Sequence, residues 1–204
     1  APLEMGHFRE KVCVAAGAKF HLVVHGENEM NRIEDFADKL QKIVTEQLQM
    51  MGGSPPFGKY VFIWHIDPRA DYYGLEHLNS TSIGMPHRLM DFGSAGESWD
   101  LYRGLDHHDI DLEYSAHEFF HLWNVKRLRP VELGPFDYTQ EVYTTGLWIA
   151  EGFTDYYGYL TLVRTGLWTP RKWLRMYANL ITRYRHASGW KYRSPSENSF
   201  DVWL

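Results

Sequence analysis

The stretch HEFFHLW, from His117 to Trp123, decides the fold prediction for this chain. Its apolar residues predict a helix, and on a helix two residues four positions apart face the same way to within about 40°. The imidazoles of His117 and His121 can therefore point at one metal ion. Glu118 lies about 100° round the same helix, beside that ion, which suits a general base that takes a proton from a water molecule at the metal.

The next predicted helix, from Leu147 to Arg164, supplies a third ligand. A bare HExxH pattern also occurs by chance on buried helices, so this second helix decides between a metal site and a coincidence. It carries Glu151 in the nearly apolar stretch LWIAEGFTDYYG, where an unpaired charge would be costly. Asp155 follows one turn later, placed to accept the spare ring N–H of a ligand histidine and to fix its tautomer. The pattern predicts one zinc ion on His117, His121 and Glu151, with an open position for water.

In the rest of the chain, hydrophobic periodicity predicts strands in the first half and helices in the second. The predicted strands are 8–15, 19–25, 60–66 and a more polar edge strand at 75–83. A helix over 33–51 is expected to begin at Asn31 and to end at Gly52-Gly53. Further helices are expected at 113–125, at 147–164, where the apolar residues on nearly every side predict a central position, and at 170–185. We expect one α+β domain, with a sheet-bearing half at about 1–100, a helical half at about 101–204, and the site in the groove between them.

The amino-acid composition and net charge limit the classes of partner that the chain can bind. The chain has 204 residues, 44% hydrophobic and 16% aromatic, which is enough for a sizeable core. Its net charge of −5 argues against a nucleic-acid partner, and it contains neither an apolar run of the roughly 20 residues that a membrane span needs nor a visible signal peptide. The single cysteine excludes an internal disulfide framework. The compartment stays open between cytoplasm and periplasm, and the oligomeric state stays open as well.

Three stretches together resemble one known family. They are HEFFHLWNVKRLRP (residues 117–130), LWIAEGFTDYYG (147–158) and GLEHLNSTSI (74–83), and the opening APLEMGHF is also similar. The combination resembles the glycyl aminopeptidases, gluzincin zinc peptidases that are related to thermolysin and aminopeptidase N and usually carry a PDZ domain. The resemblance implies a thermolysin-like zincin core, in which a small mixed sheet has an edge strand at the groove and a helical lobe carries the zinc ligands. It also implies that this chain is the catalytic core of a longer protein, without its N-terminal β domain and C-terminal PDZ domain.

The resemblance also implies roles for individual residues. His117, His121 and Glu151 would bind zinc, and Glu118 would act as base and proton shuttle. In related aminopeptidases a Gly-x-Glu or Gly-x-x-Glu motif on the edge strand holds the free α-amine of the peptide, and Gly74-Leu75-Glu76 matches it here. The strand from His77 to Ile83 would then take up the peptide backbone by strand addition. The expected substrate is a peptide with a free N-terminus and a small first residue such as Gly or Ala; the plainer alternative for Glu76 is a surface carboxylate that protects an edge strand.

The sequence departs from the family in one respect. Family members carry a downstream Tyr-Tyr-x-Lys-Gly stretch, one tyrosine of which is expected to stabilise the oxyanion. That stretch is absent here, and none of Tyr156, Tyr157, Tyr177 and Tyr184 lies in such a motif. Loss of one oxyanion donor can reduce turnover by about 10²–10³-fold. Two other functions therefore stay open: a zinc endopeptidase of the same fold, and a peptide-binding fragment with weak catalysis.

Other polar groups receive structural interpretations. The run His107-His108-Asp109, with Asp111, is interpreted as a solvated loop and not as a second metal site. His65, in a predicted buried strand, is interpreted as a hydrogen-bonded core residue. The basic residues at 126, 127 and 129 are interpreted as charges that complement the end of the zinc helix.

Overall fold

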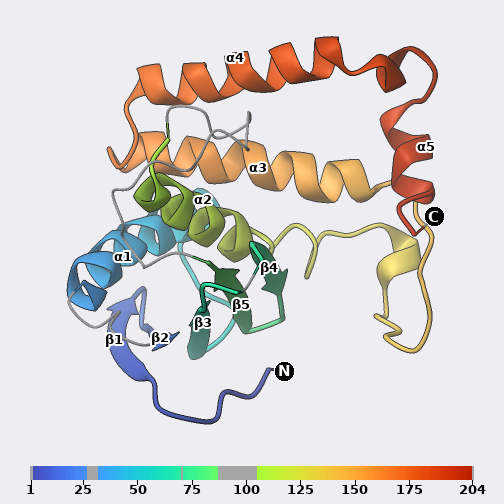
Figure 1. Cartoon of the computed structure of the whole chain (residues 1–204). Helices are drawn as coiled ribbons and strands as arrows, with labels where there is room; N and C mark the ends of the chain where they lie inside the picture. Colours follow the sequence, from blue (N-terminus) through green and yellow to red (C-terminus); the bar gives the residue numbers. More distant parts are fainter. Residues whose placement is uncertain (1, 27–31, 70, 87–104, 204) are drawn as a thin grey trace.

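The computed structural model describes residues 2–26, 32–69, 71–86 and 105–203 and shows a sheet with helices stacked over one face (Figure 1). The strands are β1 (Arg9–Ala15), β2 (Ala18–His25), β3 (Lys59–Ile66), β4 (Tyr73–Glu76) and β5 (Ser80–Met85). The helices are α1 (Ile33–Met50), α2 (His107–Phe120), α3 (Leu147–Arg164), α4 (Pro170–His186) and α5 (Pro195–Phe200), with short 3₁₀ turns at Val131–Leu133 and Ser188–Lys191. None of the helices in the described ranges is both long and apolar enough to span a membrane.

The sheet is mixed, and its strand order is β1-β2-β3-β5-β4. β1 and β2 form an antiparallel hairpin, β2, β3 and β5 run parallel, and β4 is antiparallel to β5 at one edge. The parallel pair β2–β3 needs a crossover connection, which α1 provides. This five-stranded mixed sheet with helices agrees with the predicted α+β class.

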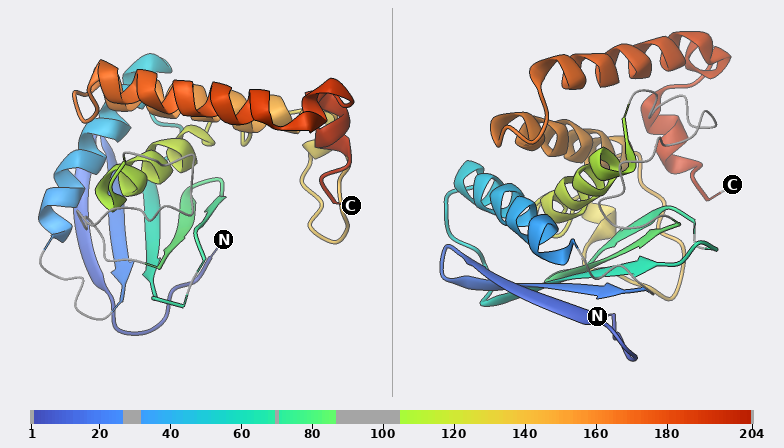
Figure 2. Two further views of the ribbon diagram at one scale, coloured as in Figure 1. Left: turned by 45° about the horizontal axis from the view of Figure 1, so that its top comes forward. Right: turned by 60° about the vertical axis from the view of Figure 1, so that its left-hand side comes forward.

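The core lies between the sheet and the helices. Alternate residues of β2 and β3 are fully buried beneath α1 and α2, including Phe20, Phe62 and Trp64, as expected for strands with one face on a core. The ring of Phe36 on α1 meets Trp64 edge to face at 5.2 Å between centroids. Figure 2 shows the helices on one side of the sheet only.

The boundaries of α1 and α4 follow from their caps. Gly52 and Gly53, with φ of 102° and 84°, end α1 as predicted. Glycine is favoured there because a positive φ is strained for residues with a side chain. Asn31 lies outside the described residues, and the N-cap position is Arg32. At α4, the Thr169 hydroxyl accepts a hydrogen bond from the Lys172 amide at 3.2 Å, and Pro170 follows at the first helical position.

The helix that carries His117 and His121 begins earlier than predicted. α2 starts at His107, because Asp106 and Asp109 form a reciprocal capping box at its N-terminus. The interpretation of His107-His108-Asp109 as a loop was therefore wrong: these residues form the first turn of α2. The buried carboxylate of Asp109 pairs with Lys172 of α4 at 2.6 Å. The regular helix ends at Phe120, and His121 occupies its C-cap position, followed by hydrogen-bonded turns.

The predicted edge strand 75–83 is instead a hairpin. Residues 77–79 form the turn, β4 is the edge strand, and β5 lies between β3 and β4. β5 is polar yet buried, because its small serine and threonine side chains fit between two paired strands. Strand addition of a peptide along 77–83 is therefore wrong, since β5 already has partners on both sides. At this end of the sheet β4 is the edge strand among the described residues.

The prediction that residues 147–164 are central to the fold was also wrong in part. One face of α3, with Ala150, Thr154, Gly158 and Leu162, is buried, whereas Trp148 and Phe153 on the opposite face are exposed. The boundaries of the helix were predicted correctly.

Candidate metal centre and active site

The site is built where α2 ends against α3, close to β4 (Figure 1). A Cβ at Gly158 of α3 would lie 3.3 Å from the backbone nitrogen of His117, so glycine allows α3 to approach α2 at the height of the first histidine. This approach brings Glu151 beside the two histidines. Its Oε2 lies 3.3 Å from His117 Nε2 and 3.5 Å from His121 Nε2, and the two Nε2 atoms are 2.9 Å apart.

These separations fit the ligand set of a zinc ion. Ligand bonds of about 2.0–2.1 Å in a tetrahedral arrangement place two ligand atoms about 3.3 Å apart. The three measured separations, 2.9, 3.3 and 3.5 Å, lie around that value. Two imidazoles and one carboxylate are also a common catalytic zinc donor set. The structure thus brings together the three residues predicted as metal ligands; the identity of the metal stays a prediction.

Hydrogen bonds on the far side of each ring fix its orientation. His117 Nδ1 donates to Asp155 Oδ1 at 2.7 Å, the partner predicted from the sequence. His121 Nδ1 donates to the backbone carbonyl of Asn124 at 2.8 Å. Neutral rings held in this way direct unprotonated Nε2 atoms at each other and at Glu151. With both rings neutral, three acceptor atoms converge, and a metal ion would satisfy all three; this observation supports a metal site most strongly.

The electrostatics of the centre favour positive charge. Burial alone would lower the pKa of His117, but hydrogen bonds to Asp155 and Glu151 raise that pKa well above its usual value. Burial alone would raise the pKa of Glu151, but hydrogen bonds from His117 and His121 lower it. Glu113 lies one helical turn before His117, with a carboxylate oxygen within 4.8 Å of ligand atoms of His117 and Asp155. Burial raises the pKa of Glu113 to about 8, with a further contribution from Asp155.

Glu118 lies beside the ligand cluster, and its carboxylate does not join it. The side chain is buried, and its Oε2 accepts a long hydrogen bond of 3.4 Å from the hydroxyl of Thr81 on β5. Burial raises the pKa of Glu118 to about 7, against the lowering effect of His117 and His121. A pKa near neutrality suits a group that accepts and returns a proton.

Gly74 makes room for this carboxylate. A Cβ at position 74 would lie only 1.9 Å from Glu118 Oε1, so the β4 backbone passes directly over the proposed base. The sequence assigned Gly74 to substrate binding through the family motif. In the structure, Gly74 leaves the space that the Glu118 side chain occupies.

Gly74→Ala is therefore expected to displace Glu118. Because the nearest atoms that the new Cβ would meet all belong to the Glu118 side chain, the fold should tolerate the change at a cost of about 1–3 kcal/mol, while kcat falls by more than tenfold. Steady-state kinetics and thermal unfolding of the variant check this. Tyr73→Phe on the same strand is the matched control, and an equal loss of activity in both variants would contradict the steric role.

Glu76, the predicted amine-binding residue, forms an ion pair. Its Oε1 lies 3.0 Å from Lys126 Nζ, and Lys126 is itself buried, with its ammonium 4.5 Å from the centre of the Phe136 ring. One carboxylate oxygen of Glu76 also lies within 4.8 Å of donor atoms of Glu118 and His121. Glu76 therefore faces the centre, which weakens the alternative of an ordinary surface carboxylate. His77 lies in the β4–β5 turn, where its Nδ1 approaches the Leu75 carbonyl at 3.2 Å.

The sequence prediction missed four residues around the centre. They are Lys126, Thr81, Glu113 and Asn124. Glu113 had a signal, because it lies four residues before His117 and so on the same helical face. Lys126 was interpreted only as a charge at the helix end, and the contacts of Thr81 and Asn124 depend on tertiary packing that local spacing does not encode.

Comparisons with known proteins concern the family and the fold of the chain. A family model described as M61 glycyl aminopeptidase matches residues 111–204. The fold is similar to the crystal structure of an aminopeptidase N family protein from Idiomarina loihiensis, with a TM-score of 0.81, 26% sequence identity, and coverage of 98% of this chain and 32% of that one. The chain thus spans about a third of the length of that relative. No curated protein sequence matches significantly. The family model and the structural match together support the assignment of this chain to the glycyl aminopeptidase family.

Proposed function

We propose that the chain is the catalytic part of a zinc-dependent aminopeptidase that hydrolyses the first peptide bond of a peptide with a free N-terminus. The convergence of His117, His121 and Glu151, at separations that suit the ligands of one ion, supports the metal. Glu76, facing the same centre, supports the preference for a free amine. The preference for a small first residue such as Gly or Ala rests on family likeness alone.

When bound, a zinc ion would lower the pKa of water toward about 7 and polarise a carbonyl oxygen. The other tasks fall to the chain. Glu118 takes a proton from the attacking water and returns it to the leaving amine. The Thr81 hydroxyl donates a hydrogen bond to this carboxylate, and Gly74, which has no side chain, leaves room for it.

Glu76 would set the position of cleavage. Lys126 contacts one oxygen of the Glu76 carboxylate, and the second oxygen can accept a hydrogen bond from the ammonium group of the substrate. The peptide would lie in an extended conformation along the outer edge of β4, which pairs with no strand in the described part of the chain. An ammonium anchored at Glu76 would then place the first peptide bond, and no later one, beside Glu118.

The ion pair also favours a second candidate function. If Lys126 neutralises Glu76 fully, no substrate amine is needed there, and the same centre would act as an endopeptidase. The two functions differ only in what Glu76 binds, so one comparison of substrates separates them.

The test compares a peptide with a free N-terminus and its N-acetylated form, using the longest natural form of the protein. The aminopeptidase function predicts that acetylation reduces kcat/KM at least tenfold, because acetylation removes the charge that Glu76 recognises. Equal hydrolysis of both peptides would support the endopeptidase. Binding of the peptide without hydrolysis by either route would reject both enzymes in favour of a peptide-binding module.

A further inference from the structure

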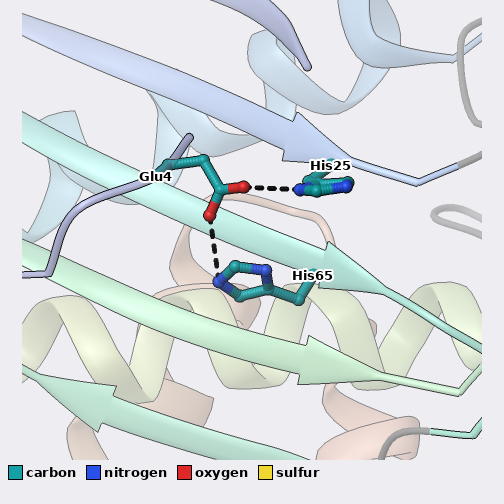
Figure 3. Close-up of side chains that lie close together, drawn as sticks. All are labelled: Glu4, His25 and His65. Carbon is teal, nitrogen blue, oxygen red and sulfur yellow. Dashed lines mark hydrogen bonds and ion pairs between the residues drawn. The ribbon is translucent and has the colours of Figure 1, made fainter. Parts of the chain in front are cut away.

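A second cluster of metal-ligand side chains lies on the other face of the sheet. His25 of β2 and His65 of β3 are register partners on neighbouring parallel strands, and both point away from the helices because the residues beside them in sequence face the core. Figure 3 shows the carboxylate of Glu4, from the segment before β1, between the two rings. Glu4 Oε1 is 2.5 Å from His25 Nδ1, and Oε2 is 3.5 Å from His65 Nε2.

The segment that carries Glu4 is oriented against hydrophobic expectation. The neighbouring apolar side chains Leu3 and Met5 are 81% and 77% exposed, whereas the Glu4 side chain is only 12% exposed. Hydrophobic burial would favour the reverse orientation. The contacts of the carboxylate with the two histidines therefore decide how this segment lies on the sheet.

A simple ion pair does not account for the second histidine. On the same face of β2, His21 pairs with Glu10 alone, at 2.6 Å, which shows what one histidine and one carboxylate need. At Glu4, donor atoms of all three residues lie within 4.8 Å of one another. Two imidazoles and a carboxylate are a donor set suited to zinc and to related divalent transition metals.

We propose that Glu4, His25 and His65 form a second binding site for a divalent transition-metal ion such as Zn²⁺, separate from the centre at α2 and α3. Two ligand atoms of one zinc ion lie about 3.3 Å apart, so the 2.5 Å contact between Glu4 and His25 has to open by less than 1 Å. Metal binding displaces the proton that this pair shares. The bound ion would fasten the segment before β1 to the ends of β2 and β3.

The experiment counts zinc in the wild type and five variants, each purified, stripped of metal and dialysed against zinc. The proposal predicts that E4Q and H65A each hold one zinc ion fewer than the wild type. H21A, which changes the neighbouring histidine–carboxylate pair, is the control and keeps the wild-type number. H121A is predicted to lose a different ion, so the double variant H65A/H121A loses two.

A second readout separates loss of ligands from loss of folding. Glu4 lies outside every helix and strand, so in the absence of metal E4Q should still unfold cooperatively, close to the wild-type temperature. Zinc should raise the unfolding temperature of H121A, in which only the second site remains, and should leave that of H65A/H121A unchanged. Equal zinc content in the wild type, E4Q and H65A would overturn the proposal and leave the cluster as an ion pair that holds the segment.

Discussion

Replacing Glu118 with glutamine is expected to reduce kcat about 10²–10⁴-fold, the usual contribution of a general acid–base group. The amide keeps the size of the side chain and can still accept the hydrogen bond from Thr81, but it cannot take a proton from water. Because Glu118 lies outside the three-atom ligand cluster, zinc content should stay at the wild-type value. The kinetics should be measured on a natural form of the protein that hydrolyses peptides.

Zinc content and unfolding temperature provide the controls for this variant. Lost activity with retained zinc and unchanged unfolding supports Glu118 as the base. Near-normal turnover would show that another group handles the proton. Loss of zinc together with activity would mean that Glu118 contributes to the metal site, contrary to its position beside the cluster.

Replacing Glu76 with glutamine is expected to reduce kcat/KM on free-amine peptides at least about 30-fold. Removal of one member of a buried, hydrogen-bonded charge pair costs at least about 2 kcal/mol, and 1.4 kcal/mol is a factor of ten. Hydrolysis of N-acetylated peptides should hardly change, so the discrimination between the two substrates should disappear. Steady-state kinetics with both peptides check this.

Lys126 supplies the matched control. In E76Q its buried ammonium loses its partner, which itself destabilises the fold. The double variant E76Q/K126M removes both charges, so it should unfold at a higher temperature than E76Q without recovering selectivity for the free amine. Recovered selectivity in the double variant would show that Glu76 acts only as the partner of Lys126.

The sequence predicted those parts of the site that depend on helical periodicity. His117 and His121, and likewise Glu151 and Asp155, are four residues apart, and a helix fixes the direction of such side chains whatever surrounds it. The position of Glu151 against the histidines needed one further assumption, that the two helices pack together. The two helices do pack together, and Gly158 at their contact allows the close approach.

Contacts between distant segments were not predictable in this way. The Glu76–Lys126 pair joins an edge strand to the turns after α2, and the Glu4 cluster joins a coil to two strands. The burial of β5 was missed because its serine and threonine residues suggest solvent exposure, whereas strand order places them inside the sheet. The start of α2 was missed because its first turn lacks apolar periodicity; the Asp106–Asp109 spacing was the only local signal.

The central claim is a metal ion on His117, His121 and Glu151, and a zinc count tests it most directly. The count should be made in the E4Q variant, so that an ion at the second cluster does not contribute, and compared with E4Q/H121A. We expect one zinc ion per chain in E4Q and none in E4Q/H121A. The same zinc content in both, or none in folded E4Q dialysed against zinc, would contradict it.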